Sequence, residues 1–166
     1  MSLTIYLAGF DVFRPDAVAH GEHLKALCAQ AGHHGLYPLD TALPPGLTGP
    51  AAARWIYESN CALIRQADAV LANLNNFRGA EPDSGTAFEV GYAAALGKRV
   101  VGYLDDARPL RKQLGATHDA QGHEVEDFGL PRNLMLACGA TLVQGDAAAG
   151  LALVGNLARP NSWGAA

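Results

Sequence analysis

Short apolar stretches alternate along the chain with stretches of helical periodicity. The apolar stretches are continuous and fall at 3–9 (LTIYLAG), 35–40 (GLYPLD), 67–74 (ADAVLANL), 99–104 (RVVGYL) and 140–143 (ATLV). Runs of this length and composition are typical of strands that are buried on both faces. The pattern therefore predicts five strands in a parallel sheet.

The segments between these runs have helical features. A first helix is expected between Pro15, which suits an opening turn, and Gly32, which suits a C-terminal stop. Gly21 lies inside that helix and should cost about 1 kcal/mol relative to alanine. Further helices are expected at about 51–67, 84–98, 131–139 and 146–158. Strands that alternate with helices in this way predict an α/β fold with helices on both faces of the sheet.

Three segments have no regular pattern. Residues 41–50 (TALPPGLTGP) are too rich in proline and glycine for a helix or strand, and 75–83 (NNFRGAEPD) reads as a loop. Residues 105–128 are polar and aperiodic, which predicts a long excursion over the surface.

Composition narrows the class of protein. The chain has 166 residues, 49% of them hydrophobic and 17% charged, which fits one globular domain over 1–166. We expect no membrane span, because no apolar run reaches about 18–20 residues. The first residues lack the positive segment of a signal peptide, so the expected location is the cytoplasm. A formal net charge of −4 without a basic cluster argues against a nucleic-acid polymer as partner.

Common metal and cofactor motifs are absent from the sequence. Cys28, Cys61 and Cys138 form no CxxC pair, which argues against a thiolate zinc site or a disulfide framework. The six histidines match no metal-ligand spacing and read as solvated or packing residues. No GxGxxG follows the first strand, so nothing indicates dinucleotide binding. We expect no metal and no cofactor.

Polar residues follow three of the predicted strands. Gly9-Phe10-Asp11 comes after the first, Asp40 closes the second, and the loop 75–83 follows the third. Ligands of open α/β sheets bind at the carboxyl ends of the strands. The sequence thus predicts a polar, acidic site at this edge of the sheet.

Glu89 is the unusual residue near this edge, because it interrupts an otherwise apolar helix, TAFEVGYAAALG. A carboxylate in such a helix is costly unless it is paired or faces a cavity. Its place in the first two turns lets the helix dipole favour the ionised form, which suits a nucleophile for an anomeric carbon. The alternative is an ordinary surface glutamate. Asp83 precedes the same helix and fits an N-cap as well as a catalytic role.

Four stretches, in order, resemble the nucleoside 2-deoxyribosyltransferases. They are IYLAGFDVFRPDA, GLYPLD, ADAVLANLNNFRGAEPDSGTAFEVGYAAALGK and PRNLML, of which the third contains the specific pattern Asp-x-Gly-Thr-x-x-Glu-x-Gly-x-Ala. The resemblance implies a flavodoxin-like (Rossmann-like) α/β fold. It also implies a retaining, two-step transfer of 2-deoxyribose between nucleobases, with no cofactor, as in nucleotide salvage. A deoxynucleoside and a free nucleobase would then be the partners of the chain.

The resemblance also implies residue roles. Glu89 would attack C1′ to form a covalent glycosyl-enzyme, Asp83 would bind the sugar and manage protons, and Tyr6 would position the nucleophile. The expected substrate-binding residues are Gly9, Phe10, Asp40, Asn60, Gly85, Asn133 and Met135, with Phe10 lining the base pocket.

Two of these positions carry further expectations. Relatives commonly have an acidic residue where this chain has Asn60, so proton donation to the leaving base would fall to Asp83 or Asp40. The family completes its pocket with an asparagine from a neighbouring subunit, which corresponds to Asn133 and implies a homo-oligomer. The apolar stretch 130–139, which follows a polar excursion, is suited to covering such a partner.

Two other functions remain open on the sequence. One is a nucleoside or deoxynucleotide N-glycosidase, a hydrolase in which water replaces the acceptor base. A phosphorylated substrate would require several cations, and only Arg14 and Arg78 are near the expected site. The other is a non-catalytic nucleotide-binding module, which would have no reason to place Glu89 in an apolar helix.

Overall fold

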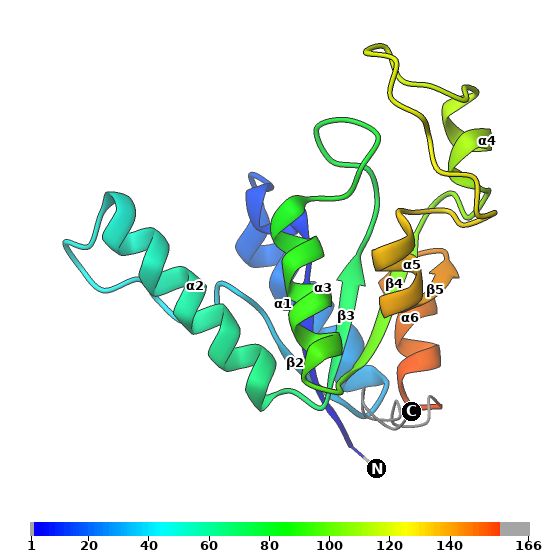
Figure 1. Cartoon of the computed structure of the whole chain (residues 1–166). Coiled ribbons are helices and arrows are strands. Elements are labelled where there is room, and N and C mark those ends of the chain that lie inside the picture. The colour runs from blue at the N-terminus through cyan, green and yellow to red at the C-terminus, as the bar shows by residue number, and fades with distance from the viewer. Residues whose placement is uncertain (1, 157–166) are drawn as a thin grey trace.

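The computed structural model describes residues 2–156 and contains one five-stranded sheet in which every strand pair is parallel (Figure 1). The strands are β1 (Thr4–Ala8), β2 (His34–Leu36), β3 (Ala69–Asn73), β4 (Arg99–Leu104) and β5 (Thr141–Gln144). Their order across the sheet is β2-β1-β3-β4-β5, the order of flavodoxin-like folds. The predicted fold class is confirmed.

Helices cover both faces of this sheet. The helices α1 (Ala17–Gln30) and α6 (Ala147–Val154) pack on one face. The other face is covered by α3 (Ser84–Ala95), α5 (Leu134–Gly139) and the C-terminal part of α2 (Gly49–Gln66). The N-terminal part of α2 extends away from the body of the molecule (Figure 1). No helix within residues 2–156 has the length and apolar character that crossing a bilayer requires.

The alternation of side chains along the strands divides the core into two layers. In β1, Ile5 and Leu7 face α1 and α6, whereas Tyr6 and Ala8 face α2 and α3. Since α3 carries Glu89, this alternation places Tyr6 beneath the proposed nucleophile.

Some elements differ from the sequence-based prediction. β2 ends at Leu36 instead of residue 40, because Pro38 cannot donate to a ladder and the Asp40 carboxylate accepts from the Tyr37 backbone N–H in a turn. A short 3-10 helix, η1 (Phe10–Phe13), follows β1 and was not predicted. The excursion after β4 contains α4 (Leu110–Leu114) and an isolated bridge between His118 and Glu124.

The two later helices are also shorter than predicted. α5 begins after Asn133, whose side-chain oxygen caps it, instead of at residue 131. α6 ends at Val154, and residues 157 and 158 of the predicted closing helix lie outside the described residues.

Gly21 has a packing reason for its place inside α1. A Cβ at this position would lie 2.4 Å from the ring of Tyr37, which is buried under the helix. The close approach of helix and ring therefore offsets the low helix propensity of glycine.

Candidate active site

A cavity of about 540 Å³ opens at the carboxyl ends of β1 and β3, where the strand order reverses direction. Its lining comes from the turn after β1, the loop after β2, one side of α2 and the start of α3. The predicted site residues among the lining are Gly9, Asn60, Asp83, Gly85 and Glu89. The rest of the lining is mainly apolar, as in many small-molecule sites.

Glu89 lies in this cavity and is held by two donors. The Tyr6 hydroxyl donates to Glu89 Oε1 over 2.6 Å, and the Asn60 amide donates to the same oxygen over 3.4 Å. Burial and the nearby carboxylate raise the pKa of Tyr6 well above its ordinary value, so the phenol keeps its proton and remains a donor. Both donors act on Oε1, which leaves Oε2 free of them.

Opposing effects set the pKa of the Glu89 carboxyl group. Burial raises the pKa of its carboxyl group from 4.5 to about 7, and the charge of Asp83 also raises it. The hydrogen bonds from Tyr6 and Asn60 act in the opposite direction and lower this pKa. Close to neutral pH the side chain is thus poised between its acid and its nucleophilic form.

Asp83 is the N-cap of α3. Its Oδ2 accepts from the Thr86 backbone N–H over 2.9 Å and from the Thr86 hydroxyl over 3.1 Å. Both hydrogen bonds use one oxygen, so the other remains free while Asp83 lines the cavity. The N-cap and a chemical role are therefore compatible in one side chain. Gly85 lies against this carboxylate, since a Cβ there would come within 3.0 Å of Asp83 Oδ2.

After β1, the aromatic residue that lines the cavity is Phe13, not Phe10. The ring of Phe77 lies between these two rings, with centroids 5.0 Å from Phe10 and 5.4 Å from Phe13. The guanidinium of Arg78 covers Phe77 and Phe13 at 4.5 and 5.2 Å. Arg78 has a φ of 53°, a left-handed conformation that no other non-glycine residue in the described chain adopts. Phe13, at the end of η1, therefore lines the cavity and is supported by Phe77 from the loop after β3. Phe10 is not part of the lining.

Asp40 does not line the cavity either, although its neighbours Leu39 and Thr41 do. One of its oxygens accepts from Lys25 Nζ over 2.7 Å and the other accepts from the Tyr37 N–H over 2.8 Å. Its carboxylate therefore shapes the loop after β2.

Asn133 and Met135 lie outside the Glu89 cavity of their own chain. They border a different hollow together with Ala87 and Gly91, which belong to α3. Met135 is 74% exposed, the highest value among the large hydrophobic side chains of the described residues. These two residues are therefore available to a neighbouring molecule and are separated from Glu89 of the same chain.

Two polar residues near the site, Asn73 and His20, were not singled out from the sequence, and Asp11 was named only as part of the stretch after the first strand. Asp11 is 4% exposed and accepts from Asn73 Nδ2 over 2.9 Å, with His20 Nε2 at 3.3 Å from its other oxygen. This cluster fixes η1 against β3 and α1. Gly9 is required beside it, because a Cβ would lie 2.7 Å from Asp11 Oδ2. The position of Asp11 directly after the first strand was the available signal, whereas His20 had none.

Trp55 was also missed and lines the cavity from α2. No lysine, arginine or histidine is part of this lining as the structure describes it. Within residues 2–156, no group of three or more His, Cys, Asp or Glu side chains is arranged to hold a metal ion. The polar groups of the site are therefore two carboxylates, a phenol and an amide, at a largely apolar cavity.

Comparisons with known proteins show which proteins this chain is similar to. A family model described as nucleoside 2-deoxyribosyltransferase matches residues 5–135. The solved structure of a 2-deoxyribosyltransferase from Leishmania mexicana is 41% identical, with a TM-score of 0.78 over 93% of this chain and 99% of that chain. An uncharacterized protein of Schizosaccharomyces pombe is 33% identical over 155 residues, covering 79% of this chain and 74% of the relative. A 2-deoxyribosyltransferase from Bacillus psychrosaccharolyticus shares the fold, with 20% identity and a TM-score of 0.59 over 87% of each chain.

Proposed function

Because the chain belongs to the nucleoside 2-deoxyribosyltransferase family, we propose that it transfers 2-deoxyribose between nucleobases by a retaining two-step mechanism. It is an enzyme of this kind, with deoxyribosyltransferase or related N-glycosidase activity. The observation that carries the proposal is the Glu89 carboxylate, which lies in a cavity with Tyr6 and Asn60 bound to one of its oxygens.

In the first step, Oε2 of Glu89 attacks C1′ of a 2′-deoxynucleoside while the C1′–N bond breaks. The base leaves with the electron pair of that bond and takes up a proton. Tyr6 and Asn60 hold Oε1, which orients the carboxylate so that Oε2 faces the sugar. The product is a deoxyribosyl ester of Glu89, and its formation relieves the oxocarbenium character that develops at C1′.

In the second step, a nitrogen lone pair of an acceptor base attacks C1′ and the ester bond breaks. Glu89 regains its charge, and the incoming base loses a proton. Two inversions at C1′ leave the anomeric configuration unchanged.

Asp83 is the best placed group to exchange protons with the base. Asp83 lines the cavity and uses only one of its oxygens to cap α3, and its charge is close enough to act on the Glu89 carboxylate. Asn60 has no acidic proton, and the Asp40 carboxylate is engaged by Lys25 and a backbone N–H. Asp83→Asn should therefore slow turnover most for nucleosides whose base is a poor leaving group, which a comparison of such substrates would measure.

The substrate that fits this cavity is a nucleoside with a free 5′-hydroxyl group. A phosphate would need several cationic partners, and the described lining includes no lysine or arginine, although Arg78 lies outside it over the Phe13 ring. The exposed ring of Phe13, which stacks on Phe77 and is partly covered by Arg78, gives the cavity an aromatic surface for a nucleobase.

We also propose that the active form is a homo-oligomer in which Asn133 of one chain completes the site of another. Its own Glu89 cavity does not include Asn133, and Met135 beside it is strongly exposed. Closed symmetric pairing of identical subunits is the common way to cover such a surface.

The main alternative is hydrolysis, in which water attacks the glycosyl-enzyme in place of a base. Incubation with deoxyinosine and free adenine, followed by chromatography, separates the two reactions. Transfer predicts that deoxyadenosine forms faster than free deoxyribose. Release of deoxyribose at the same rate with and without adenine would favour the hydrolase.

A further inference from the structure

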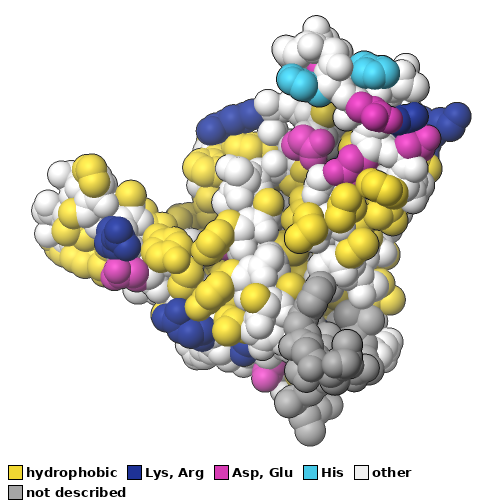
Figure 2. Space-filling model, viewed as in Figure 1, with side chains coloured by type: hydrophobic (Ala, Val, Ile, Leu, Met, Phe, Trp, Pro, Cys, Tyr) yellow, Lys and Arg dark blue, Asp and Glu magenta, His cyan; other side chains and the backbone are white. Residues whose placement is uncertain are grey.

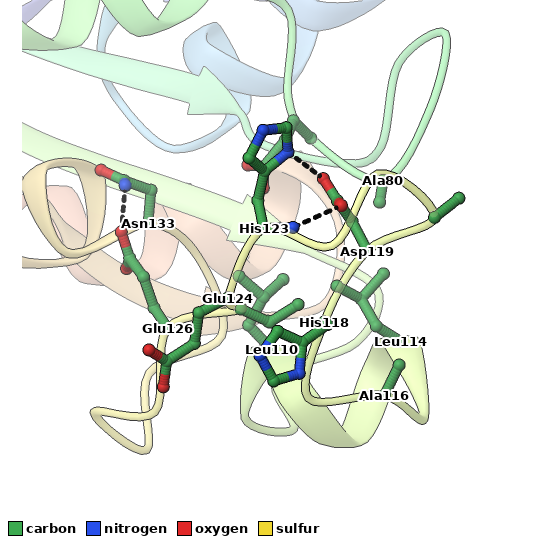
Figure 3. A pocket seen from close by; sticks show the side chains of 13 residues that line it. Ala80, Leu110, Leu114, Ala116, His118, Asp119, His123, Glu124, Glu126 and Asn133 are labelled. Carbon is green, nitrogen blue, oxygen red and sulfur yellow. Dashed lines mark hydrogen bonds and ion pairs between the residues drawn. The ribbon is translucent and has the colours of Figure 1, made fainter.

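The side-chain amide of Asn133 is held in one orientation by Glu126. Asn133 Nδ2 donates to one carboxylate oxygen of Glu126 (Figure 3). The Leu134 N–H donates to the other oxygen over 2.9 Å. Asn133 Oδ1 accepts from the Met135 N–H over 3.0 Å. A flipped amide would place its oxygen against the Glu126 carboxylate and its NH₂ against an N–H donor, so the observed orientation is strongly preferred.

This arrangement leaves Asn133 with capacity for a ligand. One of the two Nδ2 hydrogens and one Oδ1 lone pair are not used by the contacts of the chain. A hydroxyl group can donate and accept at the same time, and therefore matches this pair. The sugar of a deoxynucleoside carries such hydroxyl groups.

The residue before Asn133 anchors it to the sheet. Arg132 is 2% exposed, and its Nε donates to the Leu74 carbonyl at the end of β3 over 2.7 Å. Its NH1 donates to Gln113 Oε1 over 2.8 Å, which ties the α4 region to the same point. No carboxylate of the described residues forms an ion pair with this guanidinium. Carbonyl and amide oxygens satisfy this guanidinium instead, and these hydrogen bonds fix the backbone next to Asn133.

Apolar side chains of α3 and α5 lie on one side of Asn133, and the carboxylates of Glu81 and Glu126 lie on the other. Hydrophobic side chains gather over α3 and α5 on the face shown in Figure 2. Phe88 and Met135 are among the exposed large hydrophobic residues of these two helices. A second copy of the chain that covered this face would meet an amide whose position and orientation are already fixed.

We propose that Glu126 is a positioning residue, which orients Asn133 toward the sugar in the active site of a neighbouring subunit. This inference rests on the proposed sharing of Asn133 between subunits. Both groups that contact Glu126 are donors, so both of its oxygens must be acceptors. A carboxylate meets this requirement and a primary amide does not.

The first test compares Glu126→Gln with Glu124→Gln. Glu124 lies two residues away, is exposed, and pairs with Arg111 instead of Asn133. Glu126→Gln should lower kcat/KM about tenfold or more, because a charge-assisted hydrogen bond is lost and a donor faces a donor. Glu124→Gln should leave kcat/KM within about twofold of the wild type, as is usual for a surface pair. Equal values for Glu126→Gln and the wild type would overturn the proposal.

The second test mixes variants and measures a response that simple destabilisation would not give. Glu126→Ala is combined with Glu89→Ala under conditions of demonstrated subunit exchange, with oligomer size and melting temperature checked for each variant. A hybrid dimer then contains one site with an intact nucleophile and an intact Glu126–Asn133 pair. Random pairing should restore about a quarter of the wild-type sites.

The pair Asn133→Ala with Glu89→Ala separates the two claims. If this pair regains no activity, Asn133 does not act in a neighbouring site. The proposed sharing of sites then fails, and the role of Glu126 fails with it. If it regains activity while Glu126→Ala with Glu89→Ala does not, sharing stands and the positioning role of Glu126 is overturned.

Discussion

Replacement of Glu89 by glutamine should abolish transfer and at the same time stabilise the fold at alkaline pH. Glutamine has nearly the same shape, and its side-chain oxygen can still accept from Tyr6 and Asn60. What it lacks is the negative charge, which burial makes costly. The proposed role of Glu89 as nucleophile explains why a side chain that destabilises the fold would be kept there, because that role requires a desolvated charge.

The magnitude follows from the pKa of the carboxyl group. It rises from 4.5 in the unfolded chain to about 7 in the folded chain. Between these values the folded state binds a proton that the unfolded state has lost, so the free energy of unfolding falls as the pH rises. The difference corresponds to at most about 3–4 kcal/mol well above pH 7, and to on the order of 2 kcal/mol once screening by the open cavity is allowed for.

Thermal and denaturant unfolding of both proteins at pH 5 and pH 8 measures this difference. At pH 8, Glu89→Gln should melt about 4–8 °C above the wild type, given the usual dependence of Tm on free energy for a chain of this size. At pH 5 the wild-type carboxyl group is mostly protonated, and the gap should largely close. Glu58→Gln, at an exposed position of α2, is the matched control and should change Tm equally at both pH values. A variant that is less stable than the wild type at pH 8, or equally stabilised at pH 5, would refute the reasoning.

Two further predictions concern the same chain. Tyr6→Phe removes a hydrogen bond that lowers the pKa of Glu89, so the acid limb of kcat/KM, expected at about 7, should move to higher pH; a pH–rate profile with an unmoved limb would contradict this. Gly21→Ala should destabilise the fold by about 1–3 kcal/mol in denaturant unfolding, because the new methyl group meets the buried Tyr37 ring. Gly155→Ala, at a glycine with helical dihedral angles where a new Cβ would meet described atoms only at ordinary contact distance, is the control and should be neutral or stabilising by up to about 1 kcal/mol.

Much of the fold could be predicted from local patterns. The five apolar runs correspond to the five strands, and the cap of α3 by Asp83 follows from the sequence order Asp-Ser-Gly-Thr. The end of β2 could not be placed, because the hydrogen bond between Asp40 and Tyr37 competes with the ladder. η1 has only four residues, too few for a periodic signal.

The site was predictable to the extent that one helix or strand defines it. Glu89 stood out as a charge in an apolar helix, whereas Tyr6 was expected only from the family resemblance, and strand alternation explains afterwards why it lies beneath Glu89. That Phe13 lines the cavity where Phe10 was expected could not be predicted, because it depends on the path of η1 and on stacking with Phe77 from another loop. The contact between Asp11 and His20 likewise exists only once η1 packs on α1.

The claim at the centre of this account is the covalent bond between Glu89 and the sugar. Wild-type protein incubated with a 2′-deoxynucleoside and no acceptor base, quenched in acid and digested, can be examined by mass spectrometry. The account predicts a deoxyribosyl adduct on the peptide of α3, located at Glu89, which disappears when a free base is added before the quench. An adduct located at Asp83 instead, or base exchange that proceeds at full rate in Glu89→Ala, would contradict it.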